Sequence, residues 1–219
     1  MKPLRPFVLS AFLIAAVSLA PASARAAHDE HGGGAGAPAT ILQAQTAAAL
    51  RDLWIGHVFW VRNVIVETMA KNRAAATEAE KQVVANARAI AATIEPFYGK
   101  AASDKLFQLL AAHYGAVHKV LDASVAGDSR ARDAAGEELR ANAGEIARFL
   151  SGANPNLPFD TLNALLLAHG AHHQQQIEEW KSGDYAAEAR TWQAMKDHML
   201  TIADALAAGL AKQFPDRFA

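Results

Sequence analysis

The sequence predicts an all-α protein of three tandem helical hairpins, with a repeat of about 56 residues, that form a six-helix bundle. From residue 40 onward, alanine, leucine, glutamate and lysine predominate, and apolar residues recur at steps of three and four, as on one face of an α-helix. In addition, residues 85–113 align without a gap with residues 141–169, and 11 of the 29 positions are identical. Because residues of several types recur at the same spacing of 56 positions, the alignment indicates an internal structural repeat.

Residues 1–26 have the pattern of a secretory signal peptide. Lys2 and Arg5 precede an apolar stretch from residue 7 to residue 20, and the small-residue sequence ASARA follows it. The stretch is shorter than the roughly 20 apolar residues of a membrane-spanning helix. We therefore expect a cleaved, periplasmic or secreted protein without membrane insertion. Residues 27–39, AHDEHGGGAGAPA, predict a flexible tail before a helical-repeat domain over residues 40–219.

Breaks in the helical pattern divide this domain into six predicted helices. TEAE at residues 77–80 fits a capping box, Ser103 and Ser129 fit N-caps, and Asp160 marks a further helix start. Gly99, SGANPNLP and KSGD interrupt the pattern. The predicted helices span about residues 40–71, 77–97, 103–126, 129–151, 159–181 and 185–213. A closed bundle and a short solenoid both fit this order; we expect the closed bundle, because neither terminal helix has the polar outer face of a cap.

Composition and charge exclude several classes of site. The chain has no cysteine, which excludes disulfides, thiolate zinc sites, iron–sulfur clusters and a cysteine nucleophile. Removal of residues 1–26 would take away three basic residues and no acidic one, and would change the net charge from −1 to −4. A nucleic-acid partner would require a basic face, which this composition does not provide. Any metal site must use histidine, carboxylate or amide ligands.

A histidine occupies the same position in the first helix of each repeat. His57, His113 and His169 each end the pattern Leu-x-x-Leu-(Leu/Trp)-x-x-His, so we expect their side chains on the buried face. Two interpretations remain open. Each imidazole could be a structural residue, neutral and hydrogen-bonded to a neighbouring helix. Alternatively, the three could converge as ligands of a metal ion, and three histidines suit zinc or copper.

The third hairpin departs from the other two at two positions. It has His173 where they have valine, and His198 where they have Asn86 and Asn142. His169 and His173 lie one helical turn apart on one face, so with His198 they form a second candidate metal site. The alternative is a polar bundle end with scattered histidines, because the H-x-x-x-H spacing alone has low specificity.

A second polar layer is predicted about 8 Å from the histidines, given a rise of about 1.5 Å per residue. Hairpin turns near residues 74, 130 and 186 would place Asn86 opposite Arg62 and Asn63, and Asn142 opposite Lys119. The layer could hold a small ligand, or its cations could form ion pairs with Glu67, Asp197 or Asp204. Its candidate ligand-binding residues are Arg62, Asn63, Asn86, Lys119 and Asn142.

The motifs LW…HV.W.RN, P.YG, LSGANPN and DH…ADAL…KQFPDRF resemble a family of small bacterial helical proteins with no assigned activity. The resemblance covers about residues 50–218. Members are sometimes labelled glycosyltransferases, but this sequence has neither βα alternation nor a Gly-rich phosphate loop. The resemblance implies that the family does not share His173. It implies shared equivalents of His57, His113, Asn142, His169 and His198.

Two functions are compatible with the sequence. The first is an exported helical-bundle protein that binds a metal ion, zinc or copper, or a small ligand through buried histidines and asparagines. The second is a non-catalytic envelope scaffold or interaction protein whose polar layers only specify packing. The sequence has no recognisable nucleophile–base pair or carboxylate pair that would indicate an enzyme.

Overall fold

A computed structural model describes residues 40–219 of the chain. The predicted signal peptide and flexible tail fall on residues 1–39, outside the described residues. The described part contains no β-strand, which confirms the all-α prediction. Its elements are α1 (Ile41–Met69), α2 (Arg73–Ala92), the short α3 (Glu95–Tyr98), α4 (Lys100–Ala126), α5 (Ser129–Ala153), α6 (Phe159–Ser182), α7 (Tyr185–Gln213) and the 3₁₀ turn η1 (Pro215–Arg217).

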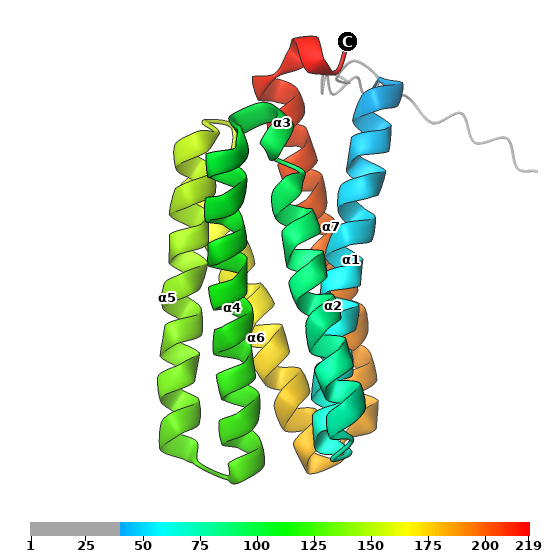
Figure 1. Cartoon of the computed structure of the whole chain (residues 1–219), viewed down its shortest axis with the longest axis vertical. Coiled ribbons are helices and arrows are strands. Elements are labelled where there is room, and N and C mark those ends of the chain that lie inside the picture. Colours follow the sequence, from blue (N-terminus) through cyan, green and yellow to red (C-terminus); the bar gives the residue numbers. More distant parts are fainter. Residues whose placement is uncertain (1–39) are drawn as a thin grey trace, which may run out of the picture. The chain divides into compact units, whose positions relative to one another are not determined.

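The six long helices form three antiparallel hairpins, α1–α2, α4–α5 and α6–α7 (Figure 1). The three hairpin turns lie at one end of the bundle, and α3 and η1 lie at the other. At that second end, the Thr40 hydroxyl donates a hydrogen bond to the carbonyl oxygen of Phe218 over 2.7 Å. The first and last helices, α1 and α7, pack against each other. The bundle is therefore closed, as expected, and is not an open solenoid.

The helix contacts have pseudo-three-fold symmetry. The first helices of the hairpins, α1, α4 and α6, contact one another in the centre. Each second helix bridges two of them: α2 packs on α1 and α4, α5 on α4 and α6, and α7 on α6 and α1. The repeated histidines all lie on the central helices, and this arrangement brings them together.

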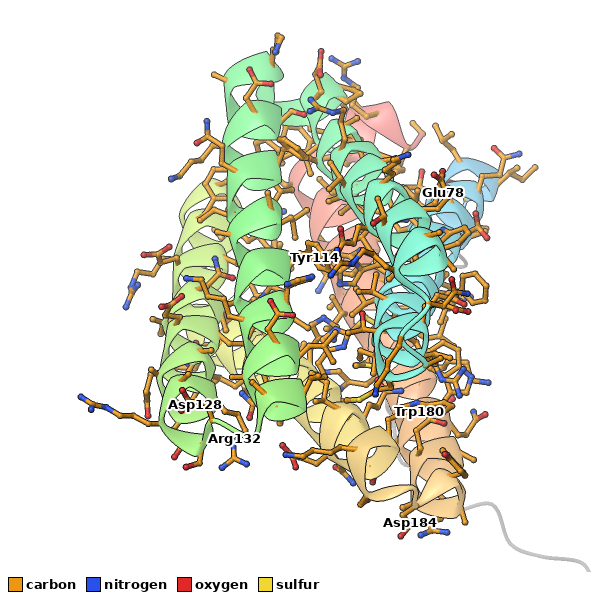
Figure 2. The ribbon with its side chains drawn as sticks, turned by 60° about the horizontal axis from the view of Figure 1, so that its bottom comes forward. Glu78, Tyr114, Asp128, Arg132, Trp180 and Asp184 are labelled. Atoms are coloured by element: carbon orange, nitrogen blue, oxygen red, sulfur yellow. The ribbon has the colours of Figure 1, made fainter. Side chains whose placement is uncertain are left out.

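The hairpin turns repeat in detail. Each has a residue with positive φ, followed by an Asn or Asp whose side chain accepts a hydrogen bond from the backbone three residues later, as an N-cap does. The positive-φ residues are Lys71, Gly127 and Gly183, and the caps are Asn72, Asp128 and Asp184. Figure 2 shows Asp128 and Asp184 at their turns. The sequence predictions of caps at Thr77, Ser103 and Ser129 are wrong, because α2 begins at Arg73, α4 begins at Lys100 and Asp128 caps α5.

One side-chain hydrogen bond recurs in all three hairpins. In each, the second helix reaches the carbonyl oxygen of a leucine 33 residues earlier: Asn86 Nδ2 to Leu53 at 3.0 Å, Asn142 Nδ2 to Leu109 at 3.1 Å, and His198 Nε2 to Leu165 at 2.8 Å. These pairs are related by the 56-residue offset, which confirms the repeat in space. They also show that the predicted pairing is wrong. Asn86 lies opposite Leu53 and not opposite Arg62 and Asn63, because each turn comes earlier than predicted.

The core consists of two apolar clusters with histidines between them. On α1, Leu50, Trp54 and Val58 belong to one cluster and Val61 and Val64 to the other, and His57 lies at the boundary. The same order holds on α4 around His113 and on α6 around His169 and His173. A polar layer thus separates the two apolar halves of the bundle. No helix within residues 40–219 combines the length and apolar character needed to cross a membrane.

Candidate metal centre

Four imidazoles make up the central layer. The exposed fraction is 4% for His57, 3% for His113 and 1% each for His169 and His173. The prediction that the repeated histidines are buried is confirmed. Ring centroids lie 5.5 Å apart for His57 and His169, and 5.4 Å apart for His113 and His169. The imidazole of His169 therefore neighbours both of the other repeated imidazoles.

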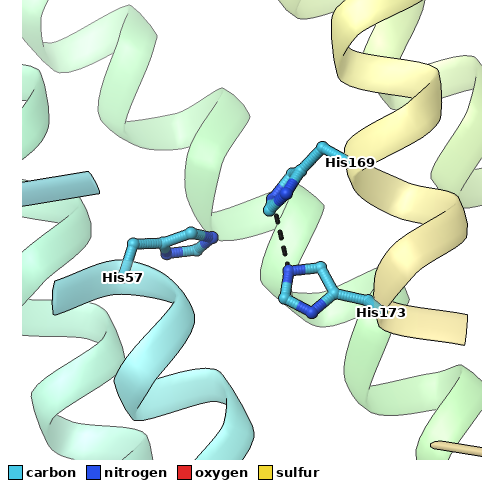
Figure 3. A group of neighbouring side chains, drawn as sticks. All are labelled: His57, His169 and His173. Carbon is cyan, nitrogen blue, oxygen red and sulfur yellow. Dashed lines mark hydrogen bonds between the residues drawn. The ribbon is translucent and has the colours of Figure 1, made fainter. Parts of the chain in front are cut away.

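Three imidazoles lie close enough together to be candidate ligands of one metal ion. His57, His169 and His173 each offer one ring nitrogen, and these nitrogens all lie within 4.8 Å of one another. His169 and His173 are four residues apart on α6, so their side chains project from the same face, and their Nε2 atoms are 3.2 Å apart. The ring of His57 on α1 points toward this pair (Figure 3).

His113 stays outside that triad, and its orientation is fixed by Asn142. The amide nitrogen of Asn142 donates to Leu109, so its Oδ1 faces Nδ1 of His113 at 3.0 Å. Oδ1 can only accept, so Nδ1 of His113 carries the proton. Nε2 of His113 then has a free lone pair, and this buried atom has no hydrogen-bond partner. The ring is nearly parallel to that of His169, at 14°.

His198 does not join the buried cluster. Its Nε2 lies 2.8 Å from the carbonyl oxygen of Leu165 and therefore carries a proton that it donates. Its ring meets that of His172 edge to face, with 5.4 Å between centroids. The two triads expected from the sequence are thus each formed only in part. The structure combines His57 and His169 from one with His173 from the other.

Burial keeps the cluster neutral. It lowers the pKa of His57 from 6.5 to about 3, with repulsion from His113 adding to the effect. It lowers the pKa of His113 to about 4, although the hydrogen bond that His113 donates to Asn142 acts in the opposite direction. The pKa values of His169 and His173 fall well below 6.5, because burial and the neighbouring imidazoles both disfavour protonation. Such groups are poor acid–base catalysts near neutral pH, but their lone pairs are available to a metal ion.

The predicted second polar layer is not formed. The side chain of Asn63 donates to the carbonyl oxygen of Phe59 on its own helix. Lys119 forms an ion pair with Glu138 on the surface, where both side chains are more than half exposed. Arg62, Asn63 and Lys119 therefore do not share a ligand site with Asn86 and Asn142. The cause is again the register of the hairpins, which pairs these positions with other parts of the facing helix.

An ion pair that the sequence does not predict joins the buried Glu188 to the partly exposed Arg62. The guanidinium of Arg62 donates through Nε and a terminal nitrogen to both carboxylate oxygens of Glu188, at 2.6 and 2.7 Å. Gln176, one turn beyond His173, donates to the same carboxylate at 3.1 Å. The guanidinium of Arg62 also lies over the rings of Trp180 and Trp192, at 5.6 and 5.3 Å from their centroids. The expected acid partners of Arg62 were therefore wrong. Glu188 could have been found, because it continues the buried face of α7 at helical spacing.

The four imidazoles leave several nitrogens without partners. Nδ1 of His57, His169 and His173 and Nε2 of His113 are buried and form no hydrogen bond. A buried polar atom without a partner costs on the order of 1–3 kcal/mol of folding free energy. A purely structural layer would be expected to satisfy these atoms, as Asn142 does for one nitrogen of His113. The arrangement therefore costs stability that hydrogen bonding within the bundle does not recover.

Comparison of this chain with protein families, with curated proteins and with solved structures finds no match, and nothing in these comparisons supports a glycosyltransferase assignment.

Proposed function

We propose that this protein binds a single transition-metal ion between α1 and α6, with His57, His169 and His173 as ligands. The observation that carries the proposal is that three buried histidines each bring one ring nitrogen within 4.8 Å of the others. Neutral imidazole is a common ligand of zinc and copper in proteins. The signal-peptide pattern of residues 1–26 supports the further proposal that the protein acts in the periplasm or outside the cell.

The spacing of the nitrogens is close to that of a formed site. Bonds of about 2.0–2.1 Å place the nitrogens of a three- or four-coordinate ion roughly 3.3–3.6 Å apart. The two Nε2 atoms on α6 are already 3.2 Å apart. Only the imidazole of His57 must then approach the pair, by about an ångström, which a small side-chain rotation achieves. The triad supports binding without a change in the helix bundle.

His113 is the nearest source of a fourth nitrogen. Its centroid lies 6.5 Å from that of His173, compared with 6.0 Å for His57 and His173. The hydrogen bond to Asn142 leaves the Nε2 lone pair of His113 free. Histidines that bind metals commonly have such a hydrogen bond on their other ring nitrogen. We expect His113 to complete the coordination, or to remain beside an open position that a small ligand can occupy.

The test is metal content and metal titration of protein without a metal-binding tag. Wild type should hold one equivalent of metal, measured by elemental analysis after purification and by calorimetry after removal with a chelator. His173→Val places in the third hairpin the residue that the other two carry, Val61 and Val117, and should abolish binding.

His118→Ala is the matched control. His118 contacts Glu80 and Asp122 at the surface and lies outside the cluster, so this variant should retain one equivalent. Circular dichroism establishes that each variant is folded. Wild-type protein that binds no metal, or a folded His173→Val protein that binds as tightly as wild type, would contradict the proposal and favour a structural layer.

A further inference from the structure

The ligands of the proposed site carry no charge, and this property selects among metal ions. The nitrogen donors are three neutral imidazoles, with a fourth in His113. We propose that the resident ion is monovalent copper, an inference that rests on the proposed metal-binding function. Its grounds are the charge around the cluster, the depth of burial and the other donors on the facing helix.

No carboxylate of the described residues compensates a charge in the cluster. The ionisable groups that perturb His57, His169 and His173 are all other histidines: His113, His172, His198 and the members of the triad themselves. Within residues 40–219 the only buried acid is Glu188, and both of its carboxylate oxygens already accept hydrogen bonds from Arg62. An ion in the cluster therefore keeps its full formal charge in the core.

The cost of burying that charge depends steeply on its size. The desolvation free energy of an ion grows with the square of its charge, so a divalent ion costs about four times as much as a monovalent one. A divalent ion could lower its charge by binding hydroxide, but the triad residues are between 1% and 4% exposed. Zinc sites built on histidines alone reach water through an open position. Monovalent copper needs neither an anion nor a water channel.

The facing helix offers a donor that suits the same ion. α7 packs against both α1 and α6, and its Met195 and Met199 are fully buried. His198 is hydrogen-bonded to Leu165, and the helices are antiparallel. Met195 is three residues before His198, and His169 is four residues after Leu165, so Met195 lies near the height of His169. Thioether sulfur is a soft, uncharged ligand that favours monovalent copper over zinc.

Competition titrations with the metal-free full chain test this inference. Under anaerobic conditions, monovalent copper is titrated against a chromophoric chelator of known affinity, and silver serves as a monovalent ion that does not change oxidation state. Zinc and divalent copper are titrated against chelators of their own. We expect both monovalent ions to bind more tightly than zinc by about a hundredfold or more, because of the charge dependence above.

Two substitutions sharpen the result. His57→Asp converts the triad into two histidines and one carboxylate, and should move the preference toward zinc. Met195→Leu conserves the volume of the side chain, and should weaken the binding of monovalent copper while zinc binding stays unchanged. Wild-type protein that binds zinc or divalent copper as tightly as monovalent copper would overturn this inference and leave metal binding intact. If the protein binds none of these ions, the proposed metal-binding function is itself contradicted.

Discussion

Acidification of the metal-free protein should destabilise it from pH 6.5 downward, before most carboxylates titrate. In the unfolded chain the histidines take up protons near pH 6.5, whereas in the folded protein His57 stays neutral to about pH 3 and His113 to about pH 4. The unfolded state binds more protons across this interval, so the free energy of unfolding falls as the pH falls. Above pH 6.5 both states are neutral, and these groups contribute no pH dependence.

The magnitude follows from the width of the interval. Each such histidine lowers the free energy of unfolding by about 1.4 kcal/mol per pH unit between its unfolded and folded pKa values. At pH 4.5 His57 and His113 together account for about 5 kcal/mol, and His169 and His173 act in the same direction. Domains of this size are typically stable by about 5–15 kcal/mol. The metal-free protein should therefore be close to unfolding at pH 4.5.

The assay is urea unfolding followed by circular dichroism between pH 7.5 and 4.5, in the presence of a chelator. His57→Leu removes one of the four groups and should reduce the slope by about 1.4 kcal/mol per pH unit. A free energy of unfolding that is equal at pH 7.5 and pH 5.0 would refute the reasoning. So would a His57→Leu protein with the slope of wild type, since the acid sensitivity would then arise elsewhere.

Three further substitutions can be measured by urea unfolding at pH 7.5. Asn142→Ala removes the hydrogen bonds of a buried amide and should cost about 1–3 kcal/mol; a loss under 0.5 kcal/mol would show that the amide is dispensable. Arg62→Met leaves the carboxylate of Glu188, 3% exposed, without its cation and should cost about 3 kcal/mol, less at pH values where the carboxylate is protonated. Gly209→Ala would bring a methyl group to 2.7 Å from Leu157 and should cost about 1–3 kcal/mol; unchanged stability would mean that Leu157 rotates away freely.

The hairpin repeat could be predicted from the sequence because identical residues recur at a constant spacing of 56 positions. The register within each hairpin could not, because it depends on where the turn begins. TEAE at residues 77–80 has the composition of a capping box, but Asn72 provides the cap of α2. Several residues near a helix start can serve as N-caps, and the position of the hairpin turn determines which of them does. If a turn lies a few residues earlier than predicted, each residue of the second helix faces a residue of the first helix that is displaced by twice that number. The predicted second polar layer is absent for this reason.

The burial of the histidines followed from the apolar face on which they lie, but their grouping did not. His57, His113 and His169 are equivalent in sequence, and their spacing alone would place them symmetrically. His173 breaks the symmetry, because only the third hairpin has an imidazole at that position and it lies one turn from His169. Which repeated histidine meets this pair depends on the packing of α1 and α4 around α6. Helix packing of this kind varies by tens of degrees between bundles and has no signature in one sequence.

The contact between Thr40 and Phe218 closes the ring of hairpins, so the arrangement of the helices does not require the chain to begin with α1. The two ends of the described domain meet beside each other, and each second helix bridges the next hairpin around the ring. A short peptide joining these ends would convert the domain into a circle of three similar hairpins. The circle could then be opened at the turn near Gly127 or Gly183, where no helix is interrupted. Any of the three hairpins could thus be synthesised first, and the same four imidazoles would still meet in the centre.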